Sequence, residues 1–276
     1  MKETKKKIEG IVLDRWDAGY KSTVLVILTR EQGVLHCFVK GAKRMQSAMF
    51  SAVQLLSYSQ FTLFCGKQYH IDDASLYNTF FSSNRDMKTA ALIQYFSELI
   101  IKTVPENVPS SEQLDLLLNT LYVLLNKKKD PLLVKTVFEI RLLSASGVRP
   151  NLIYCSRCGK YEDKMMYFNY LQNELFCSDC RKAQAAEHHL SGAAEEGYCP
   201  LSQGALTAFR YVTLSEPKKI FSFQVTKEVL MQLADCTEKF VVSFCDTRLY
   251  TLEYYKILCE MEQETDPNGR MTSENG

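Results

Sequence analysis

The sequence lacks a long apolar run. No stretch of 18 consecutive apolar residues occurs among its 276 residues, which excludes an α-helix that crosses a membrane. Lysines at position 2 and positions 5–7 are followed by charged residues between Glu9 and Asp17, and not by the apolar stretch of a signal peptide. We therefore expect a cytoplasmic protein with no membrane partner.

The sequence also has few residues suited to catalysis. It contains four histidines, two of them adjacent, which offer little material for acid–base chemistry. A glycine-rich phosphate loop and a His-Glu-x-x-His segment are both missing. These absences favour a protein that is not an enzyme.

Cysteine, by contrast, is plentiful, and four of the ten cysteines form two Cys-x-x-Cys pairs. The pairs are Cys155 with Cys158 and Cys177 with Cys180, and 18 residues separate them. This spacing is typical of a site in which four thiolates hold one zinc ion. Two Cys-x-x-Cys turns together supply the four ligands of a tetrahedral zinc site and leave no open position for a substrate. Gly159, directly after the first pair, suits the left-handed backbone that such turns often need.

The four cysteines could instead form two disulfides or a redox-active pair. A reducing cytoplasm disfavours disulfides, and two pairs at metal spacing fit a thioredoxin-like role poorly. We predict that these four cysteines bind one structural Zn²⁺. Because four thiolates fill a tetrahedron, His188 and His189 are expected at the surface, and Cys199 is a weaker substitute ligand.

Charge is divided unevenly along the chain, although the net charge is only +1. Residues 1–70 carry eight Lys and three Arg against five acidic residues, whereas residues 260–276 carry one Arg against five acidic residues. A polyanionic partner would therefore meet the N-terminal part of the chain. Residues 261–276 are polar and poor in apolar side chains, which predicts a disordered acidic tail.

The first 80 residues show a pattern of short β-strands. Residues 22–29 (STVLVILT) and 33–40 (GVLHCFVK) flank a turn and form a predicted hairpin. Residues 8–13, 55–64 and 69–76 are further candidate strands, and a segment without strand character at 42–53 separates the third from the fourth. This order predicts an OB-type barrel over residues 1–80. Such barrels bind nucleic acids on strands 2 and 3 and through their 1–2 and 4–5 loops.

Basic and aromatic residues of this predicted barrel suit single-stranded nucleic acid, which is held by phosphate attraction and base stacking. Alternation along the third strand places His36, Phe38 and Lys40 on one face. The candidate DNA-binding residues are Lys40, Lys43, Arg44, Arg15, Lys21, Lys67 and Phe38. Phe38 could equally belong to the barrel core, and loop lysines and arginines are commonly just solvated.

After residue 84 the apolar spacing changes to the three- and four-residue steps of helices. A helix is expected around residues 92–100, ended by Pro105 and Pro109, and further helices near 110–125 and 131–146. Asp130 is a start signal, Gly147 a stop, and Ser110 with Gln113 a capping box. A helix at 203–214 and one long helical stretch at 226–256 follow. The predicted fold class is therefore α+β: an OB-type barrel, then a helical domain at 81–260 that carries a zinc-binding insert at 155–180.

Several segments resemble the RecO family of bacterial recombination mediators. The most specific is a helix ending in Leu-Leu, followed by Gly147-Val-Arg-Pro-Asn-Leu152 and then Cys-x-x-Cys-Gly. Three others are similar to that family: Val39-Lys40-Gly41-Ala42-Lys43-Arg44, Leu201-Ser-Gln-Gly-Ala205 and Arg248-Leu-Tyr-Thr-Leu252. The resemblance covers residues 5–258. It departs at Asn173-Glu-Leu-Phe176, where the family commonly has glycines and where Asn173 can supply a left-handed turn instead.

The resemblance implies a protein that binds single- and double-stranded DNA, joins the partner RecR and acts on DNA coated with single-strand binding protein. It would help to load the RecA recombinase and anneal strands, associating with the nucleoid during repair, without making or breaking a bond. Only Lys40, Lys43 and Arg44 match a family motif; the other candidate residues rest on their chemistry alone. The alternative is a zinc-stabilised protein-interaction scaffold that does not bind DNA directly.

Overall fold

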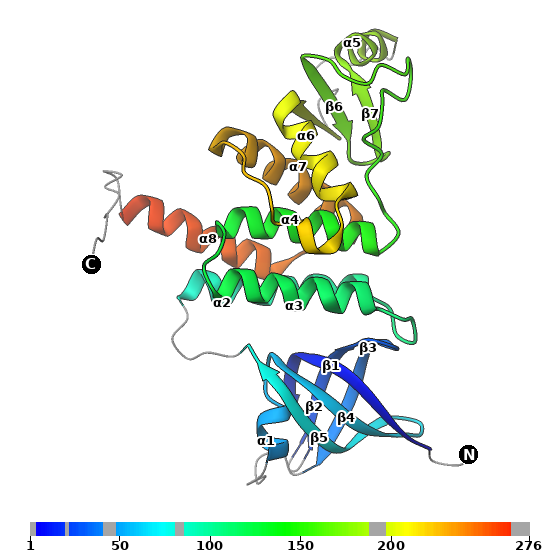
Figure 1. Ribbon diagram of the computed structural model, residues 1–276, viewed down its shortest axis with the longest axis vertical. Coiled ribbons are helices and arrows are strands. Elements are labelled where there is room, and N and C mark those ends of the chain that lie inside the picture. Colours follow the sequence, from blue (N-terminus) through cyan, green and yellow to red (C-terminus); the bar gives the residue numbers. More distant parts are fainter. Residues whose placement is uncertain (1–3, 20–21, 41–47, 81–85, 188–196, 266–276) are drawn as a thin grey trace.

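The computed structural model describes residues 4–19, 22–40, 48–80, 86–187 and 197–265, which form three successive parts (Figure 1). A β-barrel lies at one end, a body of helices in the middle, and a small sheet that carries the cysteine pairs at the other end (Figure 1). The predicted α+β class is therefore confirmed. Among the helices that the structure describes, none has the length and apolar character that a membrane crossing requires.

Five strands form a closed barrel in the order β1-β2-β3-β5-β4. They are β1 (Thr4–Asp17), β2 (Ser22–Thr29), β3 (Gly33–Lys40), β4 (Ser57–Cys65) and β5 (Tyr69–Thr79), with helix α1 (Ala48–Ala52) between β3 and β4. Strands β2 and β3 occupy the predicted residues, but β1 is longer than predicted. A bulge between Val12 and Asp14 bends it, so that residues 4–11 pair with β4 and residues 10–17 with β2.

Strand β2 is buried on both of its faces. Leu25 and Ile27 belong to the core inside the barrel, whereas Val26 and Leu28 belong to the core shared with the helices. A strand covered on both faces has no need of polar residues, which explains the unbroken apolar run. The helical body therefore covers part of the barrel's outer surface.

The helical body packs around one central helix, α4 (Pro131–Ala145). Its elements are α2 (Met87–Thr103), α3 (Ser111–Leu125), α4 (Pro131–Ala145), α6 (Gln203–Leu214), the short 3-10 helix η3 (Pro217–Lys219), α7 (Lys227–Cys245) and α8 (Tyr250–Thr265). Asp130 caps α4, and Gly147 follows it with φ 86°, as predicted. The predicted capping box is wrong: Ser110 makes no side-chain cap bond, and Gln113 donates instead to the carbonyl of Ala145 at 2.9 Å.

The helical stretch predicted over residues 226–256 is two helices. Asp246 ends α7 with φ 45°, in the left-handed conformation that stops a helix. Aspartate tolerates this conformation better than most residues, so neither Gly nor Pro marks the break in the sequence. Helix α8 then turns back to pack against α2.

The β2–β3 turn is fixed to the loop between α2 and α3. The Asn107 N–H donates to the carbonyl of Gln32 at 2.8 Å. Gly33 has φ 64°, and a Cβ at this position would collide with the carbonyl oxygen of Pro105. The barrel and the helical body therefore meet through close backbone contact at this turn.

Helix α4 is buried all round over residues 133–143, and not only along one apolar stripe. Its Lys135 and Glu139 form an ion pair of 2.8 Å, with side chains only 2% and 0% exposed. Glu139 also accepts hydrogen bonds from the hydroxyls of Tyr95 in α2 and Thr237 in α7, at 2.6 and 2.7 Å. The buried pair thus connects three helices.

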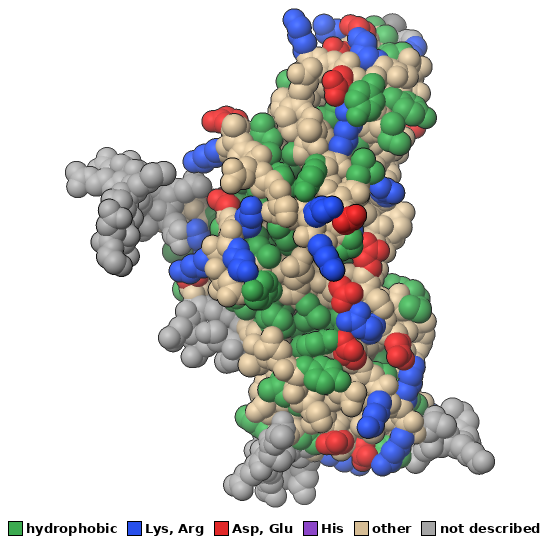
Figure 2. Space-filling view, viewed as in Figure 1, with side chains coloured by type: hydrophobic (Ala, Val, Ile, Leu, Met, Phe, Trp, Pro, Cys, Tyr) green, Lys and Arg blue, Asp and Glu red, His purple; other side chains and the backbone are tan. Residues whose placement is uncertain are grey.

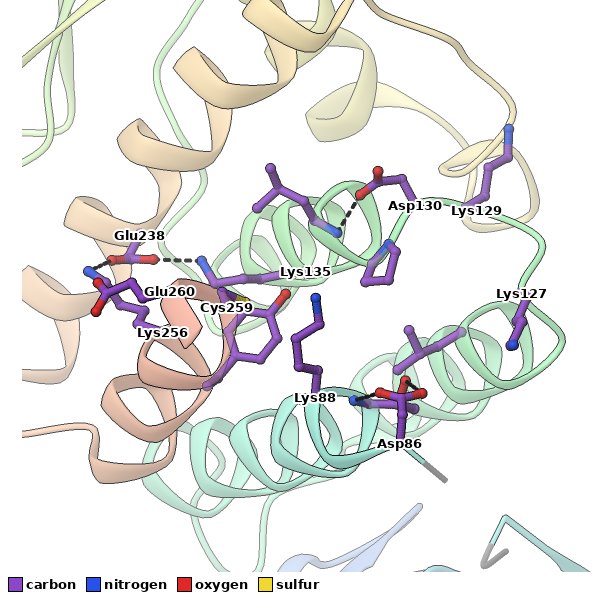
Figure 3. A pocket seen from close by; sticks show the side chains of 15 residues that line it. Asp86, Lys88, Lys127, Lys129, Asp130, Lys135, Glu238, Lys256, Cys259 and Glu260 are labelled. Atoms are coloured by element: carbon purple, nitrogen blue, oxygen red, sulfur yellow. Dashed lines mark hydrogen bonds and ion pairs between the residues drawn. The ribbon is translucent and has the colours of Figure 1, made fainter. Parts of the chain in front are cut away.

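Figure 3 shows how Lys135 of this pair is linked to side chains nearer the surface. Lys135 also contacts Glu238 of α7 at 2.9 Å, and Glu238 contacts Lys256 of α8 at 2.7 Å. These side chains line one end of a pocket of about 930 Å³ between α2, α3, α4, α7 and α8. The charges of this end of the pocket are therefore already balanced by one another.

The cysteine-bearing part is a three-stranded sheet. It consists of β6 (Met165–Asn169), β7 (Glu174–Cys177) and β8 (Tyr198–Ser202) in the order β7-β6-β8, with helix α5 (Ser178–Glu187) after β7. Strands β6 and β7 form a hairpin, and Asn173 between them has the predicted left-handed conformation with φ 58°. The sequence pattern did not predict β8 or α5.

Candidate metal centre and nucleic-acid interface

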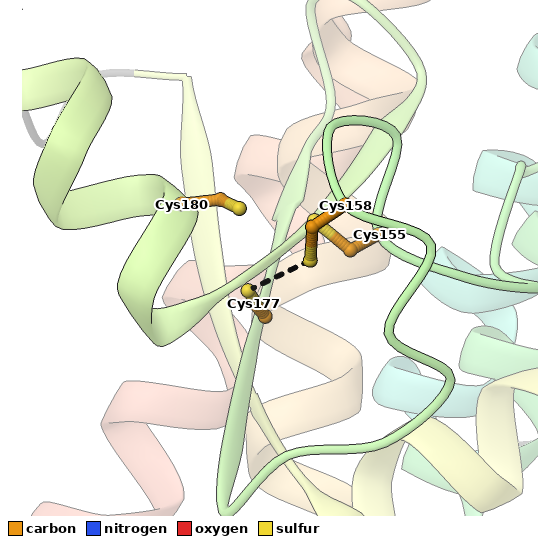
Figure 4. Close-up of side chains that lie close together, drawn as sticks. All are labelled: Cys155, Cys158, Cys177 and Cys180. Carbon is orange, nitrogen blue, oxygen red and sulfur yellow. Dashed lines mark hydrogen bonds between the residues drawn. The ribbon is translucent and has the colours of Figure 1, made fainter.

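The four predicted cysteines converge where the 155–158 turn meets β7 and α5 (Figure 4). Their sulfur atoms all lie within 4.8 Å of one another, and the Sγ atoms of Cys158 and Cys177 are 3.6 Å apart. Tetrahedral coordination with Zn–S bonds of about 2.3 Å needs sulfurs about 3.8 Å apart. Gly159 donates its N–H to the Cys155 carbonyl at 2.9 Å and has φ 76°, as predicted. This donor set fits a zinc ion.

The four thiols differ in how readily they ionise. Burial opposes ionisation of Cys155, but backbone N–H groups of Cys177, Cys158 and Arg157 outweigh it and lower the pKa of the Cys155 thiol to about 6. Desolvation and the neighbouring thiols raise the pKa of Cys180. A divalent cation would supply the charge that lets all four sulfurs be thiolates together.

The other candidate ligands are separate from this cluster. Cys199 lies buried in β8, and its pKa is lowered by a hydrogen bond with the thiol of Cys236 in α7. His188 and His189 lie outside the described residues. Asp163 and Asp179 lie near Cys177, but both form ion pairs with Lys160, at 3.5 and 3.1 Å. The cysteines alone therefore form the best candidate metal centre among the described residues.

Arg210 of α6 holds the chain on both sides of the first cysteine pair. Its Nε donates to the carbonyl of Leu152 at 2.8 Å, and its Nη2 donates to the carbonyls of Ile153 and Tyr161 at 2.9 and 2.7 Å. The guanidinium also lies 4.0 Å from the centre of the Tyr161 ring. Arg210 therefore attaches the turn to the helical body, a role that the sequence pattern did not predict.

Replacing Arg210 by Ala is expected to lower the free energy of unfolding by roughly 2–4 kcal/mol, because three carbonyls lose charge-assisted hydrogen bonds to a largely buried guanidinium. Amide hydrogen exchange should quicken at Cys155 and Gly159. Arg248→Ala is the matched control, because that arginine is exposed and solvent screens its ion pair with Glu253. Equal exchange rates in the wild type and the Arg210 variant would refute this role.

A row of ring-bearing residues crosses the open part of the barrel's outer surface. Trp16 in β1 lies opposite Val24 in β2, Val24 opposite Phe38 in β3, and Phe38 opposite His70 in β5. The rings of Phe38 and His70 are 5.6 Å apart, and Trp16 is 45% exposed. We call Trp16, Phe38 and His70 the aromatic row. The burial pattern of β3 confirms that His36, Phe38 and Lys40 share one face.

Two of the predicted cations border the aromatic row. Lys40 is exposed at the end of β3, and Lys67 is exposed in the β4–β5 turn, three residues before His70. His36, two residues before Phe38, contacts Glu106 of the α2–α3 loop at 3.2 Å, and the Tyr69 hydroxyl in β5 donates to the side-chain carbonyl of Asn107 in the same loop at 3.3 Å. The helical body therefore bounds the row on the side of His36 and Tyr69, and Lys40 lies on the opposite side of Phe38.

The remaining predicted residues do not join this group. Arg15 is half-buried and donates to the side-chain carbonyl of Gln54, just after α1. Lys21, Lys43 and Arg44 lie outside the described residues. Among the predicted DNA-binding residues, the structure thus places Phe38 and Lys40 on one face of β3 and Lys67 in the turn that precedes His70.

The sequence pattern missed Trp16 and His70. Trp16 could have been found if the first strand had been extended past Leu13, which needs knowledge of the bulge. His70 is brought beside Phe38 by the parallel pairing of β3 with β5, which follows only from closure of the barrel. Local patterns do not contain that information.

The distribution of charge over the surface indicates a DNA-binding site less clearly than the positions of the aromatic row and its lysines do. On the face drawn in Figure 2, Lys and Arg side chains are interspersed with Asp and Glu along the height of the molecule. The described residues drawn there form no broad area of one sign. Local combinations of rings and cations are therefore a better guide to an interface.

The fold and the two candidate sites define a class: a barrel joined to a helical body, with a four-cysteine cluster and a surface of the kind that nucleic-acid-binding proteins use. Family models agree with this division. The one described as Recombination protein O N terminal matches residues 1–80, and the one described as Recombination protein O C terminal matches residues 84–249.

Individual relatives carry the same name. The chain is 30% identical over 253 residues to DNA repair protein RecO of Acetivibrio thermocellus, which covers 91% of this chain and 96% of the relative. It is 27% identical over 230 residues to DNA repair protein RecO of Bacillus pumilus, covering 83% and 86% of the two chains. The chain belongs to the RecO family of DNA repair proteins, and the resemblance seen in its sequence is confirmed.

Proposed function

We propose that this protein is a DNA-binding recombination mediator that holds single-stranded DNA on the aromatic row. The observation that carries the proposal is the grouping of Trp16, Phe38 and His70 on one outer surface with Lys40 and Lys67 beside it. Bases stack on such rings with about 1–3 kcal/mol each, and lysines attract the phosphates.

The barrel supports an OB-type assignment. Its strand order and the helix between β3 and β4 suit that fold, whose ligands lie on strands 2 and 3. Here the helical body covers Val26 and Leu28 on that face. We therefore assign the DNA to the uncovered part, from Trp16 to His70.

We also propose that the four cysteines hold one Zn²⁺ in a structural role. Bound there, the ion would tie the 155–158 turn to β7 and the start of α5. Four sulfur ligands leave no position for an activated water, and mediation of strand exchange breaks no bond. We infer that the protein is not an enzyme.

Membership of the family supports further partners. We propose that this chain joins RecR, acts in the cytoplasm on DNA coated with single-strand binding protein, binds double-stranded as well as single-stranded DNA, and helps recombinase loading and strand annealing. The family gives the DNA repair role itself.

The test is the paired variant Trp16→Ala/Phe38→Ala. We expect its affinity for a labelled single-stranded oligonucleotide to fall about tenfold or more, because two stacking rings are lost. Tyr122→Ala is the control, because Tyr122 is an exposed ring on α3 outside the row. Unchanged affinity in the paired variant, with folding intact, would favour the scaffold without direct DNA binding.

A further inference from the structure

A second pocket lies far along the chain from the aromatic row. It has a volume of about 380 Å³ and lies between the end of α6 and the segment that leads to the first cysteine pair. This volume is within the range of small-ligand sites, about 300–1,000 Å³. Neither the metal centre nor the aromatic row includes it.

Part of the wall of this pocket consists of exposed apolar side chains. Ile153, Tyr161 and Leu214 line it and are 57%, 56% and 62% exposed. Exposed apolar side chains scattered singly are ordinary, but a group around one hollow indicates a binding site. Tyr161 is the ring of the group, and the guanidinium of Arg210 is stacked on it.

Two polar side chains at this pocket have no bonding partner among the described residues. Arg149 and Asn151 both line it and are exposed. The Arg149 guanidinium and the Asn151 side-chain amide form no hydrogen bond or ion pair with any residue that the structure describes. An amide offers both a donor and an acceptor, and a guanidinium offers a fork that matches phosphate oxygens.

We propose that this pocket receives a base of single-stranded DNA, as a second contact for the strand held on the aromatic row. Tyr161 would stack with the base, Asn151 would hydrogen-bond its edge, and Arg149 would hold a neighbouring phosphate. An apolar peptide side chain would also fit the walls, but it would leave the amide and the guanidinium without a partner. The inference rests on the proposed function of the row.

Contacts between the two sites support one continuous strand. The α2–α3 loop touches the row's side of the barrel, since Glu106 contacts His36. Gln113 at the start of α3 then donates to the carbonyl of Ala145 at the end of α4, four residues before Arg149. The pocket and the row therefore lie towards the same end of α3, and Figure 1 shows the α4-to-β6 segment above that end.

The test compares two oligonucleotide lengths on the full, metal-loaded chain. A strand of about 8 nucleotides matches the site size of one OB barrel, and a strand of about 30 nucleotides can reach beyond it. We expect Tyr161→Leu and Arg149→Ala each to weaken binding of the long strand about fivefold or more and to leave the short strand unchanged. Tyr250→Leu on α8 is the control, since that ring is also exposed and lies 5.0 Å from an arginine, Arg248.

The outcomes separate the two proposals. If the short strand fails to bind the wild type, the proposed function itself fails. If the short strand binds but both variants hold the long strand as the wild type does, the pocket receives no base and this inference is overturned. Arg149→Ala changes only an exposed side chain, so it decides the matter even if Tyr161→Leu disturbs the turn.

Discussion

Removal of the proposed zinc ion is expected to loosen the sheet that carries the cysteines and the helical body beside it, while the barrel keeps its fold. Chelation, or Cys155→Ser, should lower the melting temperature and quicken amide exchange in β6, β7 and α5. Strands β1–β5 should exchange as before, because their interior is a separate core.

The size of this effect follows from what else holds the sheet. Isolated zinc-finger peptides gain an apparent 10–16 kcal/mol or so from their metal. Here Phe168 and Leu175 also pack into the core of the helical body, so part of the sheet's stability does not depend on the ion. We therefore expect partial release of the sheet rather than unfolding of the whole chain.

Elemental analysis and calorimetry test this expectation. Protein purified without a chelator should hold about one equivalent of zinc. Cys65→Ser is the matched control, because Cys65 is a half-buried thiol at the end of β4, outside the cluster. Less than about half an equivalent of zinc, or a melting temperature that chelation leaves unchanged, would contradict the metal centre.

Lys135→Met is expected to lower the free energy of unfolding by about 3–5 kcal/mol, because it leaves Glu139 fully buried without its cation. In the wild type, burial opposes the charge of Lys135, but Glu139 and Glu238 outweigh it and raise the lysine pKa. The stabilisation is therefore complete at neutral pH and is lost only as the pH rises through that raised pKa.

Urea denaturation with two comparison variants tests the buried pair. Lys239→Met removes an exposed lysine at the same spacing from an acid, Asp235, and should change stability by about 0.5 kcal/mol or less. Lys135→Met/Glu139→Gln should be more stable than Lys135→Met alone, since no unpaired charge remains. If the free energy of unfolding of Lys135→Met lies within about 1 kcal/mol of the wild-type value, the buried pair contributes little to stability.

Features set by local chemistry could be predicted from the sequence. Strands β2 and β3 lie at their predicted residues, because β-branched runs around a tight turn leave little freedom in register. The four cysteines meet as predicted, because the Cys-x-x-Cys spacing and the left-handed Gly159 define the first turn.

Features that depend on contacts between distant parts of the chain could not be predicted from the sequence. Lys135 is buried with two partners, and one of them, Glu238, comes about a hundred residues later in the chain. The position of Arg210 depends on three carbonyls of a segment about fifty residues earlier. The helices also bury part of the barrel's outer surface and so determine which aromatic rings remain exposed there. Trp16 and His70 are among those rings, and local sequence patterns had not indicated them.

We propose that single-stranded DNA binds the barrel through rings and lysines. Fluorescence anisotropy with a labelled single strand, repeated over a salt series, tests it most directly. Two phosphate contacts, at Lys40 and Lys67, predict that the logarithm of affinity falls with the logarithm of salt with a slope of about −1.4 or steeper. Absence of binding at low salt by folded, metal-loaded protein, or an affinity that salt does not change, would contradict the claim.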